Sequence, residues 1–362
     1  MRFTSRPHAL AVARAVGVVA LPVVASGWLV GSRGDARVSD AYLQGTPGNV
    51  VLGGPLAPPG GDESGDGTAP LRRADAADPF VVVDDGRPWL FTTNNAAGNV
   101  PVVTGAGTDG VVLSDALPVL PAWSVPGFTW APAVTPTDDG WVLAFTARHR
   151  ASGRQCIGVA TSPTVDGPYA PQPDPLVCDL DHGGSIDPSF VADDAGRRWL
   201  LYKDDGNCCG LPTALQAVPL SPSATALAGP PALLLTADQP WEGRLVEAPS
   251  MTEVGDRWLL LYSGNRWDTA GYAVGAAWCE TPVGPCDKQP GRALTAGGGL
   301  DGPGGVEFVS GLDSDGVAVT FHAWPQGAVG YDDGSTRRLR VGRVVTTAAA
   351  GVSVVPRRLG AR

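Results

Sequence analysis

Two stretches of this sequence match each other closely: "DPFVVVDDGRPWLF" at Asp78–Phe91 and "DPSFVADDAGRRWLL" at Asp187–Leu201. Each begins with Asp-Pro and an apolar run, continues through an acidic turn that contains Gly, and ends on an apolar run led by Trp. Asp and Gly accept the backbone conformations of tight hairpins, so each stretch predicts two antiparallel strands joined by a short turn. Proline cannot donate to a strand ladder, which places it at the head of the first strand.

The same unit recurs along the chain. Further copies begin at Ala131 ("APAVTPTDDGWVLAFTA") and Ala248 ("APSMTEVGDRWLLLYSG"), and a weaker one begins at Val306 ("VEFVSGLDSDGVAVTFHAW"). The five starts are separated by about 53, 56, 61 and 58 residues, which is room for four strands each. Regular spacing with strand content predicts an all-β fold, a five-bladed β-propeller. A two-sheet sandwich would explain the strands but not the spacing.

In such a ring, each copy supplies the inner hairpin of a blade and the segments between copies supply the outer strands. The tail "RRLRVGRVVTTAAAGVSVVP" from Arg337, together with a strand near the N-terminus, is expected to complete the last blade. We therefore assign residues 71–362 to one propeller domain and residues 35–70 to an N-terminal strand followed by a Gly/Pro-rich linker.

Composition narrows the function. The 362 residues are 43% hydrophobic and 17% charged, with 49 Gly and 34 Pro, which suits many strands joined by tight turns. The formal net charge is -10 and no basic patch stands out, which argues against nucleic acid as a partner.

The N-terminal residues 1–34 are typical of an export signal. Arg2, Arg6 and Arg14 precede an apolar run at 15–30, and small residues cluster near its end. The run is shorter than the roughly 20 residues that span a bilayer, so we expect cleavage, with an uncleaved N-terminal anchor as the alternative. The prediction is a secreted, extracellular protein that is monomeric and free of the membrane after cleavage.

Six cysteines fit an exported chain. Cys279 and Cys286 bracket a short loop suited to a local bridge, and Cys156 and Cys178 flank a strand–turn–strand segment. The neighbours Cys208 and Cys209 are left open between a bond to each other and free or differently paired thiols. No Cys-x-x-Cys pattern occurs, which argues against structural zinc.

In a propeller, the aspartates of the two Asp-Pro pairs should lie close together. The first strand of every blade lines the central axis, so Asp78 and Asp187 should meet at one funnel although they are 109 positions apart. Glu247 precedes Ala-Pro, where strict strand alternation would aim it to the opposite side unless the strand head bends. Crowded carboxylates in an apolar funnel take different pKa values, as glycoside hydrolysis requires of its acid and base.

These motifs, "ADPF", "WAP", "SIDPSF" with "YKDDGN", "VEAPSM" with "LYSGN", and "FHAW", resemble glycoside hydrolase family 43 in sequence and order. The resemblance covers nearly the whole chain after the linker. It implies an inverting glycosidase in which Asp78 is the general base and Glu247 the general acid. Asp187 would be the third carboxylate, which raises the pKa of the acid and holds it in place.

The resemblance also implies supporting residues. Trp130 would form a wall of the sugar pocket, and Arg337 or Arg338 would contact substrate, with Arg338 taken as the candidate. Asn207, in "KDDGN", is a further candidate contact, unless it only makes the turn. His322 matches a histidine near the central channel, where some members hold calcium or a water cluster, although a satisfied core histidine is the alternative. No organic or redox cofactor is required.

The expected function is therefore hydrolysis of pentosyl linkages in an oligo- or polysaccharide. We place α-L-arabinofuranosides of arabinan or arabinoxylan first and β-xylosides second. A propeller that binds glycans without catalysis is the alternative of another class. No Gly-x-Ser-x-Gly nucleophile pattern or phosphate-binding loop occurs.

Overall fold

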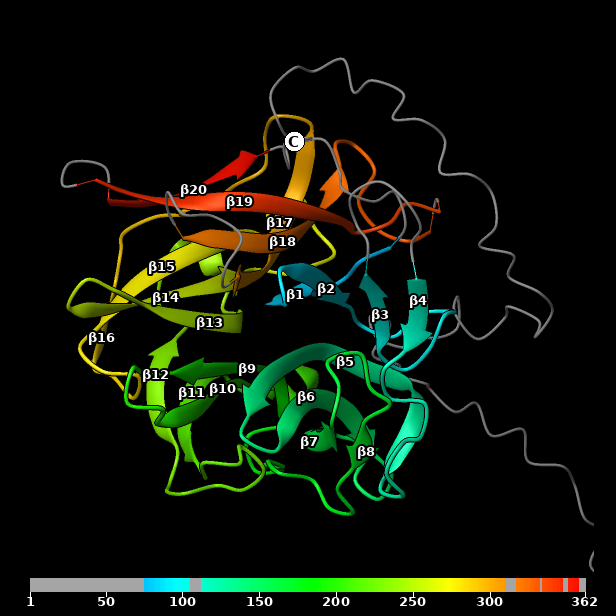
Figure 1. The fold of residues 1–362 in the computed structure, drawn as a ribbon. Coiled ribbons are helices and arrows are strands. Elements are labelled where there is room, and N and C mark those ends of the chain that lie inside the picture. The colour runs from blue at the N-terminus through cyan, green and yellow to red at the C-terminus, as the bar shows by residue number, and fades with distance from the viewer. Residues whose placement is uncertain (1–74, 105–111, 310–316, 333, 348–350, 358–362) are drawn as a thin grey trace, which may run out of the picture.

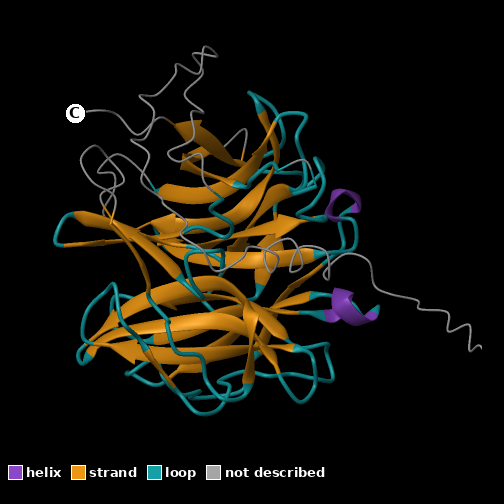
Figure 2. Cartoon of the chain, turned by 90° about the vertical axis from the view of Figure 1, so that its right-hand side faces the viewer, coloured by secondary structure: helices purple, strands orange, loops and turns teal. Residues whose placement is uncertain are grey.

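The computed structural model describes residues 75–104, 112–309, 317–332, 334–347 and 351–357. Within them, strands form five antiparallel sheets of four strands, arranged around a common axis (Figure 1). This arrangement confirms the five-bladed β-propeller. The two helices among the described residues are the 3-10 turns η1 (Gly206–Cys209) and η2 (Pro240–Glu242), both on the same side of the disc in Figure 2. Neither of them approaches the length of a bilayer span.

The blades follow one another in chain order, each from four consecutive strands. The strands are β1 (Phe80–Asp84), β2 (Arg87–Phe91), β3 (Pro101–Thr104) and β4 (Val112–Asp115); β5 (Ser124–Thr137), β6 (Gly140–His149), β7 (Gln155–Ser162) and β8 (Ala170–Pro171); β9 (Ser185–Ala192), β10 (Arg198–Asp204), β11 (Ala214–Leu220) and β12 (Ala232–Thr236); β13 (Val246–Val254), β14 (Arg257–Gly264), β15 (Ala273–Cys279) and β16 (Cys286–Lys288); β17 (Leu300–Val309), β18 (Ala318–Pro325), β19 (Arg338–Thr347) and β20 (Gly351–Arg357).

The repeated stretches form the inner hairpins, as the sequence predicts. In the first blade, Asp84 pairs with Arg87 across a two-residue turn. Its central residues Asp85 and Gly86 have φ of 48° and 71°, as a type I′ turn requires.

Buried apolar residues gather between the blades. Five clusters occur in the described residues, and each joins two neighbouring blades around the ring. Phe91 and Phe145, for example, belong to one cluster between the first and second blades. Sheets that bury both faces in this way stay in fixed relative positions, which fixes where the strand heads meet.

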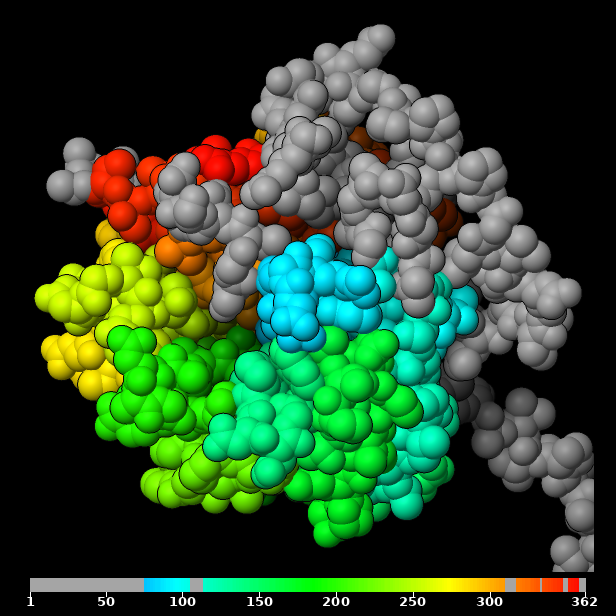
Figure 3. Space-filling model, in the orientation of Figure 1, coloured from blue at the N-terminus to red at the C-terminus, as the bar shows by residue number. Residues whose placement is uncertain are grey.

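The ring closes without a shared strand. Blades one and five each complete their own four strands, so the tail alone finishes the last blade. The strand expected near the N-terminus lies outside the described residues, as do the export signal and the linker. Across the seam, Ala76 N donates to Arg337 O at 2.7 Å and Thr320 Oγ1 donates to Pro79 O at 2.8 Å. Figure 3 shows the blue first blade packed between green and orange segments.

All six cysteines are paired. The bonds Cys156–Cys178 and Cys279–Cys286 match the expected local bridges, and Cys208 is joined to its neighbour Cys209 within η1. The question left open by the sequence is thus answered by a bond between the adjacent pair.

Candidate active site

The heads of the five inner strands share an unusual backbone conformation. The equivalent residues have positive φ of 50°, 43°, 55°, 49° and 59°: Asp78, Ala131, Asp187, Ala248 and Gly305. The fifth copy therefore starts at Gly305, one residue before the Val306 that the sequence suggested. A positive φ is costly for residues other than Gly, and such strain persists where the surrounding structure enforces it.

A ring of side chains enforces this conformation. On four heads, the amide of the strained residue donates to a side chain from the second strand of the preceding blade or the residues just after it. The pairs are Asp78 with His322 Nδ1 at 3.1 Å, Ala131 with Thr93 Oγ1 at 3.0 Å, Asp187 with Thr146 Oγ1 at 3.1 Å, and Gly305 with Ser263 Oγ at 3.0 Å.

The fourth head differs because Lys203 occupies the capping position, and an ammonium has no acceptor to offer. Asp187 Oδ2 accepts from Ala248 N instead, at 2.9 Å. Lys203 Nζ then contacts Glu247 Oε2 at 2.9 Å. The pairing register also shifts between Glu247 and Ser250. This is the bend at the strand head that Glu247 needs in order to face the same hollow as the two aspartates.

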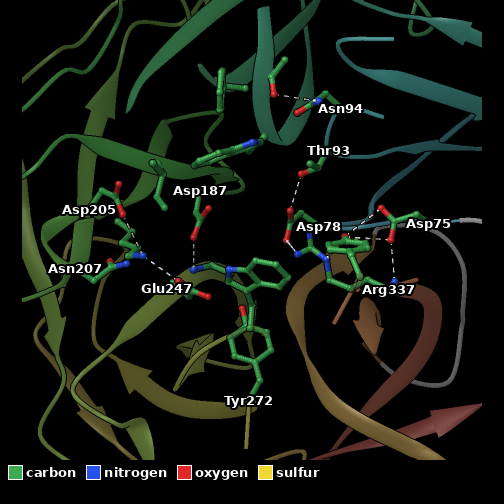
Figure 4. Close-up of a pocket in the computed structure, with 18 residues that line it drawn as sticks. Asp75, Asp78, Thr93, Asn94, Asp187, Asp205, Asn207, Glu247, Tyr272 and Arg337 are labelled. Carbon is green, nitrogen blue, oxygen red and sulfur yellow. Dashed lines mark hydrogen bonds and ion pairs between the residues drawn. The ribbon is translucent and has the colours of Figure 1, made fainter. Parts of the chain in front are cut away.

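The strand heads open into a pocket of about 140 Å³ (Figure 4). Its lining includes five predicted site residues: Asp78, Trp130, Asp187, Asn207 and Glu247. Of the two candidate arginines, Arg337 lines the pocket and Arg338 does not. Arg338 instead begins β19 and pairs with Ala323, so the structure favours its neighbour Arg337 as the candidate substrate contact.

Asp78 is held as an anion. Burial raises its pKa, but the Arg337 guanidinium and the Thr93 hydroxyl outweigh burial and leave the pKa below the ordinary value. Thr93 Oγ1 donates to Asp78 Oδ2 at 2.6 Å, and Arg337 Nη1 lies 3.6 Å from Asp78 Oδ1. Figure 4 shows Arg337 between Asp78 and Asp75. An ionised carboxylate at the pocket floor is available to accept a proton.

Asp187 is the opposite case. Burial and the nearby Glu247 carboxylate raise the pKa of Asp187 to about 8, although Lys203 acts against this shift. Lys203 is itself fully buried, and its contacts with Glu247 and Asp205 raise its pKa above the ordinary value despite burial. Asp187 therefore keeps a proton at neutral pH, beside the Glu247 side chain that contributes to the raised pKa. The pocket thus holds one ionised carboxylate, that of Asp78, and one carboxyl group, that of Asp187, which keeps a proton at neutral pH.

His322, the candidate metal ligand, supports the head of the first inner strand. Its Nδ1 accepts from the Asp78 amide, and burial together with Arg337 lowers its pKa to about 3, so the ring is neutral. Nε2 is buried without a hydrogen-bond partner, and the ring stacks on Tyr272 at 5.9 Å. Among the described residues, the one group of three ligand-type side chains is His149 with the disulfide-bonded Cys156 and Cys178. Because Nδ1 accepts a hydrogen bond, the neutral ring carries its proton on Nε2, and neither nitrogen has a lone pair to offer to calcium.

Several lining residues were missed from the sequence. Lys203 and Asp205 lie in "YKDDGN", beside the predicted Asn207. Asp204, between them, accepts from Gln216 Nε2. Asp75 accepts from the Arg337 amide at 2.8 Å, and Tyr331 Oη accepts from Arg337 Nε at 2.9 Å. These contacts fix the guanidinium beside Asp78.

Aromatic rings form the pocket walls. Phe128 and Trp130 meet edge to face at 6.4 Å, while the Arg337 guanidinium lies 4.6 Å from the centre of the Trp267 ring. Both aromatic groups border the pocket. Flat apolar walls with a few fixed polar groups are the usual construction of a small-ligand site.

Comparisons with known proteins identify the family of the chain. The family model described as glycosyl hydrolases family 43 matches residues 67–348. A xylosidase/arabinosidase 43A of Humicola insolens is 36% identical over 73 residues, a match that covers 20% of this chain and only 21% of that enzyme.

Solved structures share the fold. A thermostable family-43 glycoside hydrolase superposes with a TM-score of 0.68 at 23% identity, covering 79% of this chain and 95% of that one. An α-L-arabinofuranosidase from Lactobacillus brevis gives 0.66 at 16% identity, covering 82% and 96%. Because the family model spans most of the sequence, the chain belongs to glycosyl hydrolase family 43.

Proposed function

We propose that this protein is an inverting glycosidase, and that the pocket at the strand heads is its active site. The observation that carries the proposal is the split between two carboxyl groups of the pocket: Asp78 is held ionised, while Asp187, beside Glu247, keeps a proton. Inverting hydrolysis requires this pair of states.

In the proposed reaction, Asp78 accepts a proton from a water molecule as the water oxygen attacks the anomeric carbon. The bond between that carbon and the leaving oxygen breaks, and Glu247 gives that oxygen the proton held by the Asp187–Glu247 pair. Lys203 keeps Glu247 in place through the contact at 2.9 Å. Attack from the face opposite the leaving group inverts the anomeric centre.

We propose pentosides as substrates, with α-L-arabinofuranosides first and β-xylosides second. The small pocket, walled by Trp130 and Trp267 and crossed by Arg337, supports recognition of a single sugar unit. The similar proteins bear the names of both activities. We further propose that residues 1–34 direct export, so that the enzyme acts outside the cell on polysaccharide.

The test is hydrolysis of aryl α-L-arabinofuranoside and aryl β-xyloside, followed by product analysis on arabinan and xylan. Asp78→Asn and Glu247→Gln should each lower kcat by about 100-fold to 10,000-fold, because each removes one acid or base function. A propeller that only binds glycans would leave wild type and both variants equally inert while glycan binding persists.

A further inference from the structure

A second, smaller cavity lies directly beneath the active-site pocket. Its volume is about 20 Å³, enough for one water molecule. All five inner strands contribute to its lining: Asp78, Ala131, Pro132, Asp187, Pro188, Ala248, Gly305, Val306 and Glu307. Asp78, Asp187 and Ala248 line both cavities, so this space adjoins the reacting carboxylates from the side opposite the substrate.

Glu307 is the one acidic side chain of this lining that the proposed mechanism does not use. It lies two residues after Gly305 on β17, one layer below the strand heads. Ser189 and Ser250 occupy the equivalent positions on β9 and β13. Gly305 lets the strand head pass close to His322, because a Cβ there would lie 2.6 Å from the His322 ring.

One oxygen of Glu307 is fully engaged. Ser189 Oγ and Ser250 Oγ both donate to Oε2, at 3.1 Å and 2.6 Å. The Ser250 hydroxyl is itself oriented by Phe308 N, which donates to it at 3.1 Å. No described residue bonds to Oε1, which leaves that atom as the polar group that Glu307 can offer to the cavity.

No basic side chain lines the cavity with Glu307, and the other titratable groups of the lining are Asp78 and Asp187. Thr320 on β18 and Ser250 on β13 pack beside Glu307. Lys203 contacts Glu247 and Asp205 and does not line this cavity. Burial raises the pKa of Glu307 to about 8, and Asp187 adds to that rise against the two serine hydroxyls. A neutral Glu307 carries a proton that needs an acceptor, and the carboxylates across the cavity supply one.

We propose that Glu307 is a positioning residue of the active site: its Oε1–H donates through one water molecule in the lower cavity to the Asp187 carboxylate. This inference rests on the proposed function. A hydrogen bond to the ionised form of Asp187 favours that form. The proton of the Asp187–Glu247 pair is then directed to Glu247, the carboxyl group that faces the leaving oxygen.

The test compares Glu307→Gln, which keeps a donor but cannot ionise, with Glu307→Leu, which removes the donor. Glu253→Gln on the exposed part of β13 is the matched control. We expect Glu307→Leu to lower kcat by about 10-fold to 100-fold with little change in KM, because one hydrogen bond to a charged group is lost. Glu307→Gln should restore kcat at neutral pH and move the alkaline limb of the pH profile upward.

A readout independent of turnover separates this inference from the proposed function. Infrared difference spectra of wild type minus Glu307→Gln, both substrate-free near pH 6, should show a neutral carboxylic acid band that belongs to Glu307 and is absent from the spectrum of wild type minus Glu253→Gln. Absence of that band from the wild type minus Glu307→Gln spectrum would overturn the inference, even for a protein that hydrolyses nothing. Equal losses of kcat in the Gln and Leu variants, or an unchanged alkaline limb in the Gln variant, would overturn it as well.

Discussion

Lys203 Nζ lies 2.9 Å from Glu247 Oε2 at the one strand head whose amide lacks the cap found on the other four. The ring is thus nearly five-fold in its backbone, and a single lysine breaks the pattern where the proposed acid lies. Asp187 takes over the vacant capping role by accepting from Ala248 N at 2.9 Å. One substitution in the repeat therefore links two of the three carboxylates.

Replacing Lys203 tests this link. Lys203→Met should reduce the free energy of unfolding by about 3 kcal/mol, since it leaves Glu247 buried without its cation. Lys203→Thr restores the cap that Thr93 and Thr146 provide elsewhere, and should fold better than the Met variant while remaining poorly active. Denaturant unfolding and kcat together check this. Full activity in either variant would show that Glu247 does not need the ammonium.

The pH profile should follow the opposed shifts of the carboxylates. Asp78 has a lowered pKa, so the base stays ionised, and activity persists, until the pH falls below the ordinary range of aspartate. The pair containing Asp187, with its pKa near 8, keeps its proton below that value and loses it above, so the alkaline limb should lie near pH 8. Asp187→Asn should move this limb to lower pH in plots of kcat/KM. A profile identical to wild type would argue against the pair as the proton source.

Substitutions of the neighbouring residues Arg337 and Arg338 should have different effects on activity. Arg337→Met removes the cation beside Asp78, which should move the acid limb to higher pH and raise KM by about tenfold or more. Arg338→Met, outside the pocket, is the matched control and should change KM little. Equal effects of the two variants would contradict the assignment of Arg337 to the site.

His322 should make stability depend on pH. The folded state holds the imidazole neutral with a pKa of about 3, whereas the unfolded chain binds a proton near pH 6.5. Between these values the unfolded state carries the extra proton, so stability falls as the pH is lowered from about 6.5 toward 3. His322→Gln keeps an acceptor for the Asp78 amide and should show a shallower loss. Parallel thermal melts of both proteins from pH 7 to pH 4 provide the comparison.

The propeller fold could be predicted from the sequence because the same hairpin pattern recurs five times along the chain. The meeting of Asp78, Asp187 and Glu247 follows from that repeat, once each copy is placed at the start of an inner strand. The bend that turns Glu247 inward depends on a positive φ at Ala248, and a single sequence shows no sign of it.

What escaped prediction depends on single-residue register. Arg337 and Arg338 are adjacent, and a shift of one residue moves a side chain to the other face of a strand. Glu307 belongs to the weakest copy, and only the start at Gly305 aligns it with Ser189 and Ser250. Lys203 lies in a stretch that the sequence suggests is a turn. Its role is recognised only when the equivalent position of the other four blades is compared, where Thr, Ser or His caps the strand head.

The Asp78–Arg337 contact spans the seam between the first blade and the last. Synthesis from the N-terminus produces the proposed base long before its guanidinium partner, which follows 259 residues later. A nascent or truncated chain therefore presents Asp78 in a half-built site, without the cation that holds it ionised. Catalytic competence should therefore appear only when the first and last blades have docked against each other.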